Sequence, residues 1–121
     1  MSHRILIVDD EPNIVISLEY LMKKEGFEVA VATDGEAALQ QAAAFAPDLI
    51  LLDVMMPKKS GFEVCQALRA DPARAAVKII MLTAKGRESE VTKGLALGVD
   101  AYITKPFSTK DLVLQIKSLL A

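Results

Sequence analysis

Short aliphatic runs alternate along the chain with longer amphipathic segments. Five runs have the length and composition of β-strands, at residues 4–8, 28–32, 49–53, 77–82 and 100–104. The run at 49–52 consists of four aliphatic residues, which is typical of a strand buried on both faces of a parallel sheet. It ends on Asp53, and Pro57 soon rules out its continuation. This strand should therefore deliver Asp53 to the carboxyl edge of the sheet.

Five segments with helical periodicity lie between and after these strands, at residues 12–25, 36–45, 61–68, 88–97 and 109–120. Asp34-Gly35 should form a turn before the second of these helices. Ser60 and Glu63 have the spacing of a capping box, and Gly26 and Gly98 are natural helix stops. Strictly alternating strands and helices predict a doubly wound, five-stranded parallel α/β sheet with right-handed crossovers. The strand order 2-1-3-4-5 suits five such units, although the alternation alone does not dictate it.

Composition sets the broad class of the protein. A chain of 121 residues suits one domain spanning 1–121, and 52% hydrophobic residues suit a sheet covered on both faces. A net charge of −2 without a basic run argues against direct nucleic-acid binding. A single cysteine, Cys65, fits a reducing compartment and should serve packing. Because neither a membrane-length apolar run nor a signal-peptide pattern is present, we expect a cytoplasmic protein.

Polar residues end four of the predicted strands: Asp9 and Asp10, Asp53, Thr83, and Lys105. All strands of a parallel sheet end at one edge, so these side chains should converge there. Each residue by itself could be an ordinary helix cap or turn residue. Five of them on otherwise apolar strands favour a functional site.

Three carboxylates this close would repel one another unless one is protonated or a hard cation binds them. At neutral pH a cation is the simpler answer, and an all-oxygen site suits Mg²⁺. We expect Mg²⁺ to bind through Asp10 and Asp53, with Asp9 acting directly or through a water. Lys105 would add positive charge without neutralising the whole cluster.

Such a site suits phosphoryl chemistry. Mg²⁺ and Lys105 would neutralise charge on the phosphoryl oxygens, and Thr83 would donate a hydrogen bond. Asp53 is then an in-line nucleophile that forms an acyl phosphate. No histidine base is needed, because a carboxylate already attacks as an anion; we expect His3 to be an exposed terminal residue.

These motifs together resemble the receiver domain of two-component response regulators, along essentially the full chain. The matching pieces are the acidic pair, the phospho-acceptor segment with its glycine, the switch hydroxyl with a small residue after it, and a Lys-Pro turn. They are Asp9-Asp10, Asp53-Val54-Met55-Met56-Pro57 with Gly61, Thr83-Ala84, and Lys105-Pro106-Phe107. Each piece is weak alone, but their order and their places at the strand ends are specific. The resemblance is to the chemotaxis-regulator type, a flavodoxin-like fold.

The resemblance implies a signalling switch rather than an enzyme. Asp53 would take a phosphoryl group from the phosphohistidine of a sensor kinase or phosphotransfer protein, and would control a downstream effector domain or protein. Met55 would offer its backbone carbonyl to Mg²⁺, and the Lys105-Pro106 peptide would be cis. Tyr102 would follow Thr83 and shift the face made by the fourth helix, fifth strand and fifth helix. From the sequence alone, without the resemblance, Tyr102 would be interpreted as an ordinary half-buried aromatic side chain on a strand.

Two departures from the family bear on assembly. Regulators that dimerise through that face usually carry an Asp before the strand-five Tyr and an Arg in the last helix, whereas this chain has Ala101 and Gln115. We therefore expect a monomer or a weak dimer. The chain ends at Ala121, as a stand-alone receiver or one cut from a longer regulator would.

Met55 and Lys85 would flank the phosphoryl group, and the apolar Met55 predicts moderate self-dephosphorylation.

Three alternatives remain open at this point. A phosphatase of the haloacid-dehalogenase kind needs an acid/base Asp two residues after its nucleophile, where this chain has Met55. A flavin-binding module needs phosphate donors after the first strand, where Asp9-Asp10-Glu11 would repel phosphate. An interaction domain that keeps the fold without being phosphorylated would have no reason to gather three carboxylates.

Overall fold

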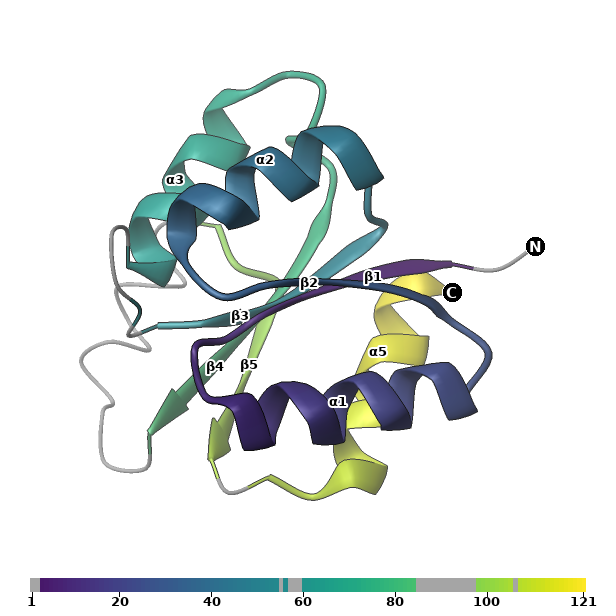
Figure 1. The fold of residues 1–121 in the computed structure, drawn as a ribbon. Helices are drawn as coiled ribbons and strands as arrows, with labels where there is room; N and C mark the ends of the chain where they lie inside the picture. Colours follow the sequence, from purple (N-terminus) through teal and green to yellow (C-terminus); the bar gives the residue numbers. More distant parts are fainter. Residues whose placement is uncertain (1–2, 55, 57–59, 85–97, 106) are drawn as a thin grey trace.

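A computed structural model describes residues 3–54, 56, 60–84, 98–105 and 107–121. Five parallel strands form one sheet in the order β2-β1-β3-β4-β5, which confirms the predicted α/β class and strand order (Figure 1). The strands are β1 (Arg4–Val8), β2 (Glu28–Ala32), β3 (Leu49–Asp53), β4 (Lys78–Ala84) and β5 (Ala101–Lys105). Three of them keep their predicted bounds, whereas β4 and β5 each begin one residue later than expected and end at Ala84 and Lys105.

The central position of β3 explains its sequence. It pairs with β1 on one side and β4 on the other, and all five of its residues are buried. A strand covered on both faces has no use for polar residues along its length. The edge strand β2 is only partly buried, which agrees with its more mixed composition.

Four helices are described: α1 (Pro12–Lys24), α2 (Gly35–Phe45), α3 (Gly61–Ala70) and α5 (Thr109–Leu120). The predicted helix at 88–97 lies outside the described residues. The predicted capping box is present at α3, where Ser60 and Glu63 exchange hydrogen bonds, and Ser108 caps α5. Asp34 was expected in a turn; its carboxylate instead accepts from the Ala37 amide and begins α2 one residue early.

The helices cover the sheet in two layers (Figure 1). Helices α2 and α3 lie on one face and α1 and α5 on the other, so the sheet has a separate apolar core on each side. Alternating strand residues supply the two cores: Leu6 and Leu52 face one, and Ile7 and Leu51 the other. Cys65 is buried in the α2–α3 core, as a packing residue should be.

Arg69, near the end of α3, links this helix to the amino ends of β4 and β5, opposite the strand ends that carry the predicted site. Its guanidinium donates to the carbonyls of Gly98 (2.9 Å), Ala75 (2.9 Å) and Val77 (2.6 Å) and to the carboxylate of Asp100 (2.9 Å). The same Asp100 oxygen also accepts from the Ile79 amide at 2.8 Å. One side chain thus links the end of α3, the start of β4 and the turn before β5.

No helix among the described residues is both long and apolar enough to cross a bilayer.

Candidate functional site

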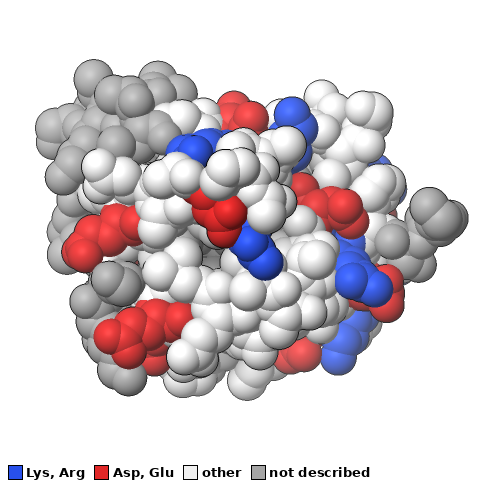
Figure 2. Space-filling view, turned by 90° about the horizontal axis from the view of Figure 1, so that it is seen from above, with Lys and Arg blue, Asp and Glu red and all other residues white. Residues whose placement is uncertain are grey.

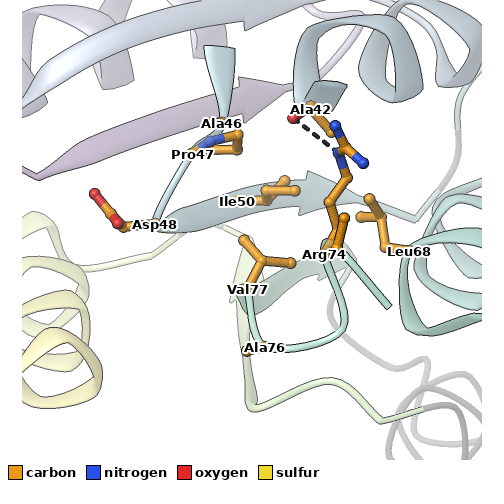
Figure 3. A pocket seen from close by; sticks show the side chains of 10 residues that line it. Ala42, Ala46, Pro47, Asp48, Ile50, Leu68, Arg74, Ala76 and Val77 are labelled. Carbon is orange, nitrogen blue, oxygen red and sulfur yellow. Dashed lines mark hydrogen bonds between the residues drawn. The ribbon is translucent and has the colours of Figure 1, made fainter. Parts of the chain in front are cut away.

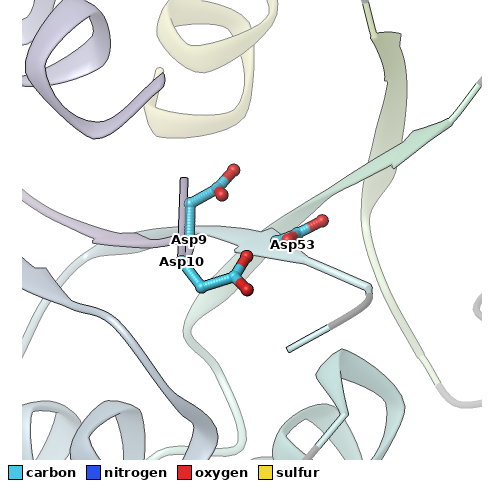
Figure 4. Close-up of side chains that lie close together, drawn as sticks. All are labelled: Asp9, Asp10 and Asp53. Carbon is cyan, nitrogen blue, oxygen red and sulfur yellow. The ribbon is translucent and has the colours of Figure 1, made fainter. Parts of the chain in front are cut away.

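Three carboxylates gather at the carboxyl edge of the sheet. Asp9 and Asp10 directly follow β1, Asp53 ends the neighbouring strand β3, and the register pairs Val8 with Leu52 just before them. One oxygen from each carboxylate lies within 4.8 Å of the others, a spacing that could hold a metal ion (Figure 4). Asp9 and Asp53 are buried, and Asp10 is exposed. The predicted convergence of these residues is confirmed.

Backbone contacts hold Asp9 and Asp53 in place. The Asp9 amide donates to Ala32 of β2 at 3.2 Å, and one Asp9 carboxylate oxygen accepts from the Glu11 amide at 2.9 Å. After Asp53, the Val54 amide donates to Leu82 of β4 at 3.1 Å. These bonds fix the directions in which both strands deliver their acids.

Gly61 brings α3 against the backbone of the Asp53 strand. Its amide donates to the Val54 carbonyl at 2.8 Å, and a Cβ at this position would lie 2.3 Å from the Asp53 carbonyl oxygen. Only glycine permits such a close approach of two backbones. Gly61 therefore sets how closely α3 packs behind Asp53.

Lys105, the last residue of β5, points its ammonium into the carboxylates. Its Nζ lies 2.9 Å from Asp9 Oδ2, 3.3 Å from Glu11 Oε1 and 3.5 Å from Asp53 Oδ1. Burial acts to lower the pKa of Lys105, but the hydrogen bond to Asp9 and the charges of Asp53 and Asp9 raise it overall. The amine is therefore charged at neutral pH and offsets part of the cluster's negative charge.

The environment of Asp53 disfavours its ionised form. Burial, followed by the negative charge of Asp9, raises the pKa of Asp53 from 3.8 to about 6, although Lys105 opposes the shift. One nearby lysine therefore does not compensate the carboxylates fully. A divalent cation would provide what is missing, and oxygen donors at this spacing suit Mg²⁺.

Thr83 and Tyr102 lie on the neighbouring strands β4 and β5. Thr83 is buried and pairs with Thr104, and Tyr102 pairs with Met81 one pleat below. Met81 and Tyr102 both belong to the α2–α3 core, and Thr83 is two residues beyond Met81 on the same strand. Side chains two apart on a strand share a face, so Thr83 and Tyr102 lie on one side of the sheet. Tyr102 is half-buried, as an ordinary strand aromatic would be.

Some predicted features fall outside the described residues: Met55 and its carbonyl, Lys85, and Pro106 with its cis peptide. The departures at Ala101 and Gln115 are both described; Ala101 packs against the α1–α5 core, and Gln115 is exposed on α5. His3 is exposed, as expected.

The molecular surface above α2 and α3 is charged unevenly (Figure 2). On the left of the view the charged side chains that are described are acidic, whereas Lys and Arg side chains lie among further Asp and Glu side chains in the middle and on the right.

A separate recess of about 330 Å³ lies at the opposite end of the sheet (Figure 3). It is lined by the end of α2, by Ile50 and Val77 at the starts of β3 and β4, and by Leu68 of α3. Arg74 closes one side by donating to the Ala42 carbonyl at 3.2 Å. None of the predicted site residues lines this recess.

Comparison with known proteins decides the family. The sequence profile of the response regulator receiver domain matches residues 5–117. The chain belongs to this family. It is a receiver domain of two-component response regulators, a signalling module, so the phosphatase and flavin-binding alternatives are set aside.

Relatives of this receiver domain agree with that assignment. The chain is 47% identical over 120 residues to the alkaline phosphatase synthesis transcriptional regulatory protein PhoP of Bacillus subtilis, covering 99% of this chain and 49% of PhoP. The chain thus spans about half the length of the curated relatives it matches. Among solved structures, the chemotaxis response regulator CheY4 of Vibrio cholerae is similar with 30% identity and a TM-score of 0.92, covering 98% of this chain and 99% of that one. The receiver domain of the sensor histidine kinase PA1611 from Pseudomonas aeruginosa, solved with a magnesium ion coordinated in its active site cleft, has 28% identity, a TM-score of 0.91, and coverage of 99% and 98%.

Sequence reasoning overlooked one member of the site, Glu11. It was noted only as a charge that would repel phosphate, yet its carboxylate contacts Lys105. The signal was present, because three acidic residues follow β1 in a row. No pattern in the sequence says that the third one turns toward a lysine 94 residues away.

Proposed function

We propose that this receiver domain accepts a phosphoryl group on Asp53, from a phosphohistidine of a sensor kinase or phosphotransfer protein, in a Mg²⁺-dependent reaction. The observation that carries the proposal is the gathering of Asp9, Asp10 and Asp53 within 4.8 Å, with the Lys105 ammonium among them. Burying several carboxylates together costs stability, and a domain with a purely structural role would have no need of them.

Asp10 and Asp53 are the proposed direct Mg²⁺ ligands, with Asp9 binding directly or through a water and Met55 contributing its backbone carbonyl. The donors are oxygens, and the raised pKa of Asp53 indicates negative charge that Lys105 alone does not balance. When bound, Mg²⁺ would screen the carboxylates and neutralise charge on the phosphoryl oxygens. The magnesium ion in the PA1611 receiver domain supports this proposal.

The chemistry requires little besides charge and positioning. A carboxylate oxygen of Asp53 forms a bond to phosphorus while the bond from phosphorus to the donor nitrogen breaks, and the histidine leaves with its electron pair. Lys105 neutralises a phosphoryl oxygen, and Thr83 donates a hydrogen bond to another. The domain would promote its own phosphorylation and dephosphorylation only, which makes it a switch rather than an enzyme.

Phosphorylation would be read through Thr83 and Tyr102. A phosphoryl group adds charge and strong acceptors, so it would draw the Thr83 hydroxyl toward it. Tyr102, on the next strand and the same face of the sheet, could then move into the vacated space. The two arrangements would be in equilibrium, and phosphate would bias it toward a shifted face at the fourth helix, β5 and α5.

The expected partners and setting follow from the family. We propose a single receiver domain over 1–121 that acts in the cytoplasm, as a monomer or weak dimer. It would control an effector domain or protein without contacting nucleic acid itself. PhoP is a transcriptional regulatory protein about twice as long, which supports an effector in the remaining half of such relatives.

Intact mass tests the proposal. The domain is incubated with acetyl phosphate and Mg²⁺, beside the Asp53→Asn variant and a wild-type sample with chelator. We expect one phosphoryl group on the wild type with Mg²⁺, and none in the other two samples. Labelling of Asp53→Asn, or equal labelling with chelator, would contradict the proposed nucleophile or the proposed metal. An unlabelled wild type would favour an interaction domain that is not phosphorylated.

A further inference from the structure

Helix α1 begins without the side-chain cap that its first turn could use. Its N-cap residue is Glu11, in an extended conformation with φ −90° and ψ 112°, and the side chain makes no capping hydrogen bond. The first turn also contains no acidic residue. The shorter oxygen-bearing side chains Ser, Asp and Asn would normally occupy this position. The Glu11 carboxylate is directed instead to Lys105, 3.3 Å from its Nζ.

Glu11 therefore has two contacts with the site. Its amide donates to Asp9 Oδ1 at 2.9 Å, and its carboxylate accepts from Lys105, which also donates to Asp9 Oδ2 at 2.9 Å. Asp53 is the most distant of the three acceptors, at 3.5 Å. The two closest contacts of the ammonium thus lie on the β1 side of the site, away from the proposed nucleophile.

We infer that Glu11 is a positioning residue: it holds Lys105 toward β1 and so slows phosphoryl transfer to Asp53. The inference rests on the proposed function and adds a device that tunes its rate. Before Lys105 can contact a phosphoryl group on Asp53, it must give up part of its contact with Glu11. The lost helix cap is consistent with a residue selected for the site rather than for stability.

The expected effect is modest, because Glu11 is largely exposed and exposed ion pairs are weak. Removing the contact should accelerate phosphorylation of Asp53 by about two- to five-fold, the range that a weak ion pair can produce. A larger change would indicate that Glu11 takes part in the chemistry itself.

Two variants separate the contact from the charge. Glu11→Gln removes the charge and keeps the length, so that only a weaker hydrogen bond to the neutral amide oxygen can remain, whereas Glu11→Asp keeps the charge and is one methylene group too short to maintain the contact. Asp is also a better N-cap, so Glu11→Asp should raise the melting temperature by about 4 °C while it releases Lys105. Glu19→Gln is the matched control, because Glu19 lies within α1 and, like Glu11, is a glutamate paired with a lysine, here Lys23 at 3.2 Å.

Two measurements test the inference. The first is the Nζ chemical shift of Lys105, observed through its Hε protons in metal-free protein; the second is the phosphorylation rate with acetyl phosphate at saturating Mg²⁺. We expect both Glu11 variants to move the Lys105 signal and to react faster, and Glu19→Gln to match the wild type. An unmoved Lys105 signal in both variants would overturn the inference. So would faster reaction of Glu11→Gln alone, because a long-range charge effect would then explain the rate.

The two possible failures can be told apart. If the wild type is not labelled, the proposed function fails, and the Lys105 signal still decides whether Glu11 holds the lysine. If the wild type is labelled on Asp53 but the Glu11 variants keep its rate and its Lys105 signal, only the positioning role fails.

Discussion

At the scale of single residues, the site is built from groups that the fold would be more stable without. Asp53 is buried beside Asp9, and its pKa of about 6 expresses the resulting cost. The folded carboxyl binds its proton more tightly than the unfolded one, whose pKa is near 3.8. This destabilisation is absent below the unfolded pKa, grows as the pH rises, and is complete above about pH 6.

Asp53→Asn should therefore stabilise the metal-free domain at neutral pH. An amide of the same shape carries no charge to desolvate, and the full shift corresponds to at most about 3 kcal/mol. We expect a gain of about 1–3 kcal/mol at pH 7.5 in urea denaturation with chelator, shrinking as the pH falls toward 4. Glu19→Gln removes a half-exposed charge that makes a helix-surface ion pair with Lys23, and should change stability by less than about 0.5 kcal/mol. Equal stability of Asp53→Asn and wild type at pH 7.5 would mean that the cluster carries no such cost.

At the scale of secondary-structure elements, β4 and β5 connect the site to the rest of the domain. Their carboxyl ends carry Thr83 and Lys105, and their amino ends are tied to α3 through Arg69 and Asp100. These bonds hold the amino ends of the two strands. A displacement of Thr83 should therefore move the carboxyl ends of the pair. Both of the following predictions concern this pair.

Thr83→Ala should separate phosphorylation from its readout. Asp53, Asp10 and Lys105 remain in place, so acetyl phosphate and Mg²⁺ should still label the variant. The hydroxyl that would follow the phosphoryl group is lost, so backbone amide shifts of β5 and the ring signals of Tyr102 should no longer respond. NMR spectra of both proteins with and without phosphodonor make the comparison. A full phosphate-dependent response in Thr83→Ala would contradict this route of coupling.

Arg69 should be a stability determinant that lysine cannot replace. Its guanidinium makes four hydrogen bonds in different directions, and three of their acceptors are backbone carbonyls. Lysine has the charge but not the planar fork, so Arg69→Lys should cost about 2 kcal/mol and Arg69→Ala about 3 kcal/mol. Urea denaturation measures both, with Lys24→Ala on the exposed side of α1 as control. A loss below about 0.5 kcal/mol for Arg69→Lys would show that these bonds contribute little.

At the scale of the whole molecule, the strands and their common edge could be predicted from the sequence, because they follow from simple patterns. Buried parallel strands read as aliphatic runs, and parallel strands all end at one edge of the sheet. Those two facts are enough to predict that Asp9, Asp53 and Lys105 lie together. The capping box at Ser60 and Glu63 was readable for the same reason, because it depends on local spacing.

What the sequence could not supply are contacts that depend on side-chain direction across long stretches of chain. Glu11 and Lys105 are 94 positions apart, and Arg69 and Asp100 are 31 apart; neither pair has a local signature. Asp-Gly is a common turn pair, so the sequence predicts a turn at Asp34, whereas in the structure the Asp34 side chain caps α2. The close approach at Gly61 likewise requires knowledge of where α3 meets β3.

The most direct test of the account is to locate the phosphoryl group. Borohydride reduces an acyl phosphate to the alcohol, which would leave homoserine in place of the phosphorylated aspartate. After reaction with acetyl phosphate and Mg²⁺, reduction and peptide mass mapping should find homoserine at position 53 and at no other aspartate. Homoserine at position 9 or 10, or an unreduced phosphoryl group elsewhere in the chain, would contradict Asp53 as the acceptor.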